Sequence, residues 1–144
     1  MKLKIGIQKN HIAVLFSFLI LLGGCKTQSE ELKAMLASRI STFQPSTGNE
    51  VRRSYQDKGV TLGKPIPAEV IIEYKPIGNY TVGDVYDEIV KTLLHQHWQK
   101  EELSTYQPGF FIASLSQEGF IIKASVNIQP DRGIVSIRLR TFPR

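Results

Sequence analysis

The sequence predicts a two-layer α+β domain: an N-terminal helix, then a β-α-β-β-β order in which one long helix packs on a mainly antiparallel sheet. Residues 82–98 carry apolar side chains at helical spacing. Residues 68–75 and 111–140 alternate between apolar and polar side chains, which is the period of a strand. Short turn signals within the second of these segments indicate antiparallel hairpins. One face of the sheet should therefore be apolar and covered by helix, and the other polar.

The N-terminal segment has the pattern of an export signal. Residues 1–10 contain three lysines and no acidic residue, and residues 12–22 form an apolar run in which only Ser17 is polar. A run of about eleven residues is too short for a bilayer-spanning helix, which needs about 20. Removal of residues 1–24 lowers the formal charge from +5 to +2, so the basic composition does not indicate a nucleic-acid partner.

The sequence Leu22-Gly23-Gly24-Cys25 resembles the lipobox of bacterial lipoprotein precursors, in which an aliphatic residue and two small residues precede a cysteine. The resemblance extends over the first 25 residues only. It implies that residues 1–24 are removed as a signal peptide and that Cys25, the sole cysteine, is lipidated. Two or three acyl chains make such an anchor stable, because each buried CH₂ contributes about 0.8 kcal/mol. The resemblance also implies the cell envelope. In lipoproteins of Gram-negative bacteria, an aspartate directly after the cysteine typically signals retention in the inner membrane. Lys26 stands at that position here, so we expect the periplasmic face of the outer membrane in a Gram-negative source.

The mature chain divides into two predicted parts, a lipidated N-terminus with a tether helix and linker over residues 25–49 and a small α+β domain over residues 50–144. Ser29, followed by two glutamates and an apolar stripe, predicts a helix over residues 29–42. Its stripe is expected to pack on the domain, with a partner or the bilayer interface as alternatives. Residues 44–49 are rich in turn formers and predict a hinge.

The order of elements follows from turn signals along the rest of the chain. Residues 51–67 are expected to form a turn or short hairpin. A strand follows over residues 68–75, and Thr81 with Asp84 predicts a capping box at the start of the long helix. A right-handed crossover should then lead into a meander of three strands. These strands are predicted over residues 111–116, 120–129 and 135–140.

The sequence contains no G-x-S-x-G, P-loop or G-x-G-x-x-G motif, and we predict no catalytic residue, metal or cofactor. His95 and His97 lie two residues apart, about 200° around a helix, so they cannot share a metal ion. We expect His95 to be exposed and His97 to be half-buried beside Trp98.

Basic and aromatic side chains are the candidates for contact with a partner. The basic candidates project from adjacent strands on the polar face: Lys123, Arg138 and Arg140. They could meet an anionic polymer such as peptidoglycan, or lipid headgroups, unless Glu69 and Glu73 neutralise them. The aromatic candidates lie around a Pro-Gly turn: Trp98, Tyr106 and Phe110. They form a partner patch or pack a helix end against a strand.

These observations favour a membrane-anchored envelope lipoprotein that is not an enzyme and binds an envelope protein or a cell-wall polymer. The alternative is a small envelope enzyme that acts on peptidoglycan or lipid with a carboxylate or histidine as general base. A concave site that joins a histidine to an acid would favour the enzyme. An open polar sheet face would favour binding.

Overall fold

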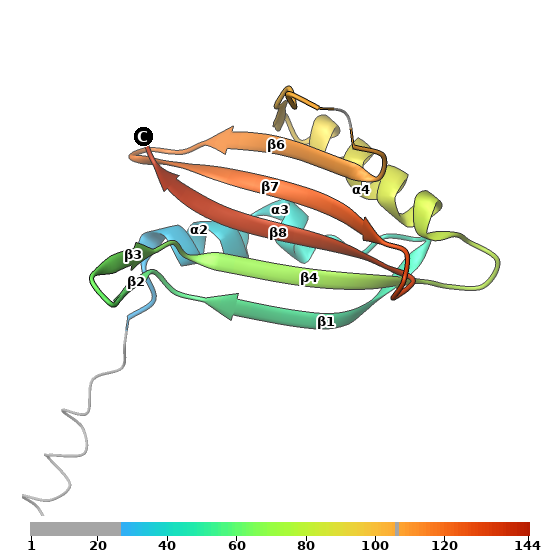
Figure 1. The fold of residues 1–144 in the computed structure, drawn as a ribbon, viewed down its shortest axis with the longest axis horizontal. Helices are drawn as coiled ribbons and strands as arrows, with labels where there is room; N and C mark the ends of the chain where they lie inside the picture. Colours follow the sequence, from blue (N-terminus) through green and yellow to red (C-terminus); the bar gives the residue numbers. More distant parts are fainter. Residues whose placement is uncertain (1–26, 106) are drawn as a thin grey trace, which may run out of the picture.

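The computed structural model describes residues 27–105 and 107–144, which form an antiparallel sheet with helices on one face (Figure 1). The six-stranded sheet has the order β1 (Gly48–Gln56), β4 (Glu69–Pro76), β8 (Ile134–Pro143), β7 (Phe120–Gln129), β6 (Phe110–Ser116) and β5 (Gln99–Lys100). The helices are α2 (Glu30–Ala37), α3 (Arg39–Thr42) and α4 (Val82–His95), and β2 (Gly59–Thr61) pairs with β3 (Lys64–Ile66) in a separate hairpin. The predicted α+β class is confirmed. The predicted signal peptide, Cys25 and Tyr106 lie outside the described residues.

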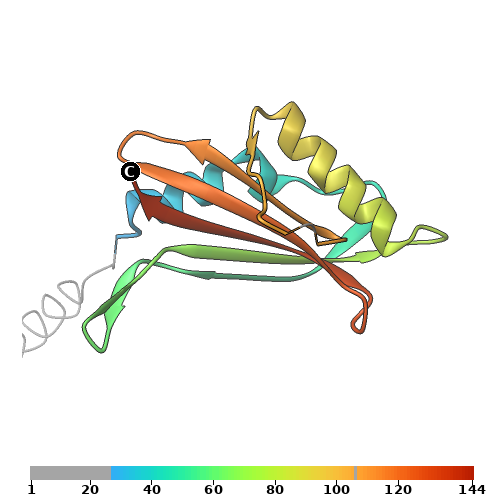
Figure 2. The same cartoon turned by 45° about the horizontal axis from the view of Figure 1, so that its top comes forward.

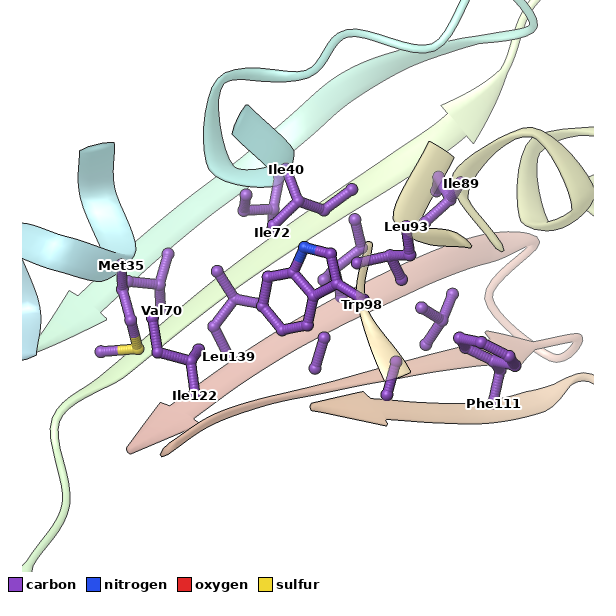
Figure 3. Close-up of a cluster of buried hydrophobic side chains, with 14 of the residues drawn as sticks. Met35, Ile40, Val70, Ile72, Ile89, Leu93, Trp98, Phe111, Ile122 and Leu139 are labelled. Carbon is purple, nitrogen blue, oxygen red and sulfur yellow. The ribbon is translucent and has the colours of Figure 1, made fainter. Parts of the chain in front are cut away.

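The core lies between the sheet and the three helices, which share one side of the sheet (Figure 2). The alternation predicted for the strands is confirmed, because every second residue of β4, β7 and β8 is buried over most of each strand. Strand and helix side chains interdigitate there (Figure 3). The fully buried members include Val70, Ile72, Ile122 and Leu139 from strands and Met35, Ile40, Ile89 and Leu93 from helices.

Helix α4 begins as predicted and ends earlier than predicted. The Thr81 hydroxyl accepts a hydrogen bond from the Asp84 N–H at 3.2 Å, and the Asp84 carboxylate accepts one from the Thr81 N–H at 2.7 Å. The helix ends at His95 rather than running to Trp98. His97 has a φ of 64°, and the Trp98 N–H then donates to the Leu93 carbonyl at 3.2 Å, which is a Schellman motif. His97 is therefore exposed, and the prediction that it is half-buried was wrong.

The single helix predicted over residues 29–42 is two helices that meet at Ser38. The Ser38 backbone is extended, with ψ at 143°. Its hydroxyl donates to the Met35 carbonyl at 2.6 Å and accepts from the Ser41 N–H at 3.4 Å, so one serine ends α2 and caps α3. Met35 and Ile40 are nevertheless both fully buried in the core. The apolar stripe of this segment thus packs on the domain.

Strand β1 lies where the sequence indicated a hinge and a turn. It pairs with β4 along its length, with a bulge between Glu50 and Arg52. Gly48 is a packing residue, because a Cβ there would lie 3.0 Å from the Lys75 carbonyl oxygen and from a Val85 methyl group. The short hairpin expected within residues 51–67 is present as β2–β3.

The connection through α4 also differs from the prediction. The antiparallel pairs β4–β8, β8–β7 and β7–β6 make β4 and β6 antiparallel to each other. The first strand after the helix is the two-residue β5, which runs parallel to β4 at the far edge of the sheet. The crossover rule for parallel strands therefore does not apply to β4 and β6.

Candidate binding surface

The open face of the sheet brings the three predicted cations together. In an antiparallel pair, residues directly opposite each other present their side chains on the same face. The register places Glu69 opposite Arg140, and Arg140 opposite Lys123. Arg138 lies opposite Ser125 in the next row. Strands β4, β8 and β7 thus carry one continuous charged row across the face.

Two carboxylates serve these three cations. Arg138 contacts a carboxylate oxygen of Glu69 through Nε at 3.5 Å, and Arg140 contacts the same oxygen through its own Nε. The Lys123 ammonium lies 3.0 Å from a carboxylate oxygen of Glu101. The three cationic side chains remain 39–48% exposed. Because both arginines use Nε toward Glu69, their Nη groups remain able to pair with a carboxylate or phosphate from outside.

An open hollow of about 280 Å³ lies among these cations and joins them to aromatic and apolar side chains. It is called the cationic hollow below, and its lining residues are Phe110, Ile112, Lys123, Ser125, Arg138, Arg140 and Phe142. The Lys123 ammonium stands 5.6 Å from the centre of the Phe142 ring, within cation–π range. Four of the predicted partner-binding residues line this hollow. The other three, Ile112, Ser125 and Phe142, were not predicted as partner-binding residues, although Phe142 continues the i, i+2 series of Arg138 and Arg140.

Glu73 is a second acidic residue of the open face, and it is neutralised separately. Only 5% of it is exposed, because Arg132 from the β7–β8 turn lies against it. Two guanidinium nitrogens of Arg132 contact its two carboxylate oxygens at 3.0 and 3.1 Å. These hydrogen bonds raise the pKa of Arg132 above its ordinary value. Glu73 therefore does not compete for the cations of the hollow.

The aromatic candidates do not form one surface patch. Trp98 is 4% exposed and packs in the core (Figure 3), which removes it from the partner-binding set. Tyr106 lies outside the described residues, and only Phe110 reaches the cationic hollow. The alternative stated for this group, packing of a helix end against the strands, describes Trp98 correctly.

The histidines and carboxylates on and beside α4 show no catalytic arrangement. His95 is exposed as predicted. Within the described ranges, no cluster of three or more His, Cys, Asp or Glu side chains could hold a metal ion.

Hydrogen bonds from the Thr81 backbone and hydroxyl lower the pKa of Asp84. Burial raises the pKa of Glu88, but hydrogen bonds from Thr47 and Ser46 outweigh it and lower the pKa overall. Both carboxylates therefore hold the fold and are poor general bases near neutral pH.

Comparisons of the chain with protein-family models, with curated proteins and with solved structures found no match. Among residues 27–105 and 107–144, no helix has the length and apolar character needed to cross a membrane.

Proposed function

We propose that this chain is a lipoprotein of the bacterial cell envelope, anchored through Cys25, whose folded part is a non-enzymatic module that binds an anionic cell-wall polymer. The observation that carries the binding role is the cationic hollow, which joins Lys123, Arg138 and Arg140 to two phenylalanine rings. The anchor rests on the lipobox-like residues 22–25 behind a basic and then apolar segment.

The chemistry of the hollow suits an extended anionic ligand. Planar guanidinium groups pair with two oxygens of a carboxylate or phosphate, which fixes orientation as well as charge. Phe110 and Phe142 offer apolar surface beside these donors. An open sheet face also accepts a long polymer more readily than a closed pocket does. A polymer that carries carboxylates beside sugar rings fits this combination, because the C–H faces of sugar rings pack on aromatic side chains. Peptidoglycan is such a polymer.

The anchor is tested by metabolic labelling of cells with a fatty-acid analogue. The wild-type chain should incorporate label, and Cys25→Ala should not, because the chain contains no other cysteine. Conversion of the precursor to the shorter mature form should also stop in the variant. Label that persists on Cys25→Ala would overturn the lipid attachment at this residue.

The binding role is tested by replacing Lys123, Arg138 and Arg140 together with glutamine. The variant should keep its free energy of unfolding to within about 1 kcal/mol, because exposed ion pairs are individually weak. Its sedimentation with isolated peptidoglycan should fall, and wild-type sedimentation should weaken as salt is raised, because screening shortens charge attraction to about 8 Å.

A matched control is the replacement of Lys33, Arg39 and Lys91 with glutamine, which removes the same charge from helices on the other side of the sheet. This control should sediment like wild type. Equal losses in the two variants would mean that net charge, rather than the cationic hollow, determines binding. The open face would be excluded if the triple variant sediments as much as wild type and if wild-type sedimentation does not change with salt.

A further inference from the structure

The β2–β3 hairpin lies beside the N-terminal end of the described chain. Thr27 lines the same surface hollow as Val60, Thr61 and Ile66. The Asp57 carboxylate, just before β2, accepts hydrogen bonds from the Ser29 N–H at 2.9 Å and from the Ser29 hydroxyl. Figures 1 and 2 both place the hairpin and the start of α2 at one end of the molecule. This arrangement fixes the hairpin to the point where the chain leads back to Cys25.

The tip of this hairpin exposes apolar side chains. Leu62 is 97% exposed and Val60 is 73% exposed, the highest values among the exposed large hydrophobic residues of the described chain. Lys64 and Pro65 on β3 are exposed beside them. Exposed apolar residues gathered at one projecting tip indicate contact with something outside the fold.

The backbone at the tip gives no reason for a leucine. Leu62 and Gly63 form a two-residue turn in which both φ angles are positive, at 50° and 76°. Such a turn favours Asn-Gly, because a bulky side chain at positive φ crowds the backbone. Leu62 therefore gains neither burial nor a preferred backbone conformation within the folded chain. A residue kept under local strain points to a role outside folding.

We propose that the β2–β3 hairpin is a second membrane contact, which inserts Leu62 and Val60 into the interfacial region of the bilayer that holds the lipidated Cys25. The inference rests on the proposed lipid anchor. Cys25 is two residues before Thr27, so their Cα atoms lie at most about 7 Å apart. Lys64 at the base of the tip suits the anionic headgroup layer.

The second contact would fix the orientation of the domain on the membrane. A lipid on a short tether restricts distance but leaves the domain free to tilt. Insertion of the hairpin tip beside the start of α2 gives a second point of attachment. The strands of the sheet would then project away from the bilayer with the β4–α4 loop at the distal end (Figure 1).

Fluorescence quenching by brominated lipid tests this proposal on the full-length gene product, purified from membranes and reconstituted in vesicles of phosphatidylcholine and phosphatidylglycerol with brominated acyl chains. The new indole in Leu62→Trp should be quenched at least about threefold more than that in Tyr80→Trp. Tyr80 is a matched control, because it is 52% exposed and lies in the β4–α4 loop. The wild-type chain supplies the background, since its sole tryptophan, Trp98, is buried.

Equal quenching at the two positions would overturn the membrane contact. A protected indole in Leu62→Trp that does not respond to bromine would also overturn it and would indicate a protein partner or a second copy of the chain. The fatty-acid label on Cys25 is measured on the same preparations. Loss of that label with strong quenching at position 62 would disprove the anchor alone, and retained label with equal quenching would disprove the hairpin contact alone.

Discussion

Two non-glycine residues of the described chain have positive φ angles, Leu62 and His97, and their surroundings differ. His97 completes the end of α4: its N–H donates to the Leu94 carbonyl at 3.2 Å, and the residue after it, Trp98, turns back into the core. The strained residue therefore allows burial of a large aromatic ring. The strained backbone at Leu62 allows no comparable burial within the fold, since the Leu62 side chain is almost fully exposed.

Leu62→Asn should raise the free energy of unfolding by about 0.5–1 kcal/mol, because asparagine tolerates the left-handed conformation of the turn. Denaturation with guanidinium chloride measures the change. Leu62→Ala serves as the control, since alanine retains the unfavourable φ and should leave stability near that of wild type. A marked loss of stability in Leu62→Asn would show that the leucine side chain packs within the fold.

The end of α4 was predicted incorrectly because it depends on the conformation of a single residue, His97. Helical spacing of apolar residues continues through His97 and Trp98, so periodicity gave no stop signal. The C-terminal motif depends on a left-handed residue, which is usually glycine or asparagine. Histidine carries no such signal. Here the burial of Trp98 outweighs the local preference.

At the scale of elements, α4 depends on its apolar stripe. Leu93→Ala should cost about 2–4 kcal/mol, because the side chain is fully buried against the sheet and its loss leaves a cavity. Lys91→Ala on the exposed side of the same helix should cost less than about 0.5 kcal/mol. Chemical denaturation compares the two. Equal midpoints would contradict the helix register described above.

The elements that the sequence predicted well are those with one buried and one exposed face. Burial forces alternation, so β4, β6, β7 and β8 could be placed closely from apolar spacing alone. Strand β1 is an edge strand whose residues are mostly exposed, and it therefore lacks the pattern. Strand β5 has two residues, too few for any period. The break at Ser38 depends on hydrogen bonds between one hydroxyl and the backbone. The spacing of apolar residues carries no information about such bonds.

The cationic hollow was predicted in part for the same reason. Alternation places Lys123, Arg138 and Arg140 on one face without knowledge of strand order. The pairing of Arg138 and Arg140 with Glu69 requires that β4 lie next to β8, and these strands are separated in sequence by α4 and three further strands. Local patterns do not contain such long-range adjacency. For this reason the sequence could not predict that Arg138 and Arg140 share one carboxylate.

At the scale of the whole molecule, hydrogen-bonded carboxylates connect segments distant in sequence. Glu88 of α4 accepts hydrogen bonds from the Ser46 N–H at 2.8 Å and the Thr47 N–H at 3.0 Å, which join the entry to β1 to the helix. Asp57 joins the hairpin to the start of α2 through Ser29. In the folded chain, the net effect of these contacts lowers the pKa of Asp57 and Glu88.

Lowered pKa values predict a loss of stability in acid. A carboxylate with a lower pKa in the folded state stabilises the fold above its ordinary pKa and ceases to do so as pH falls through its folded value. The melting temperature should therefore fall progressively below about pH 4.5, the ordinary pKa of glutamate. Thermal melts followed by circular dichroism between pH 7 and pH 2 measure this. Glu88→Gln should weaken the pH dependence, whereas Asp87→Asn at an exposed neighbouring position should not.

The outer edge of β1 affects the tendency of copies of this protein to aggregate. Its unpaired N–H and C=O groups could template a strand of a neighbouring copy, and confinement of many copies to the two dimensions of a membrane surface would raise their encounter rate. The bulge between Glu50 and Arg52 interrupts a flat register along this edge. Arg53 is held by Glu50 and by the Ser41 carbonyl at 2.7 Å, while Arg52 is exposed on the opposite face of the strand. Each of the crowded copies would therefore present a bulge and the exposed charge of Arg52 along the β1 edge, and both features oppose pairing of that edge with a neighbouring strand.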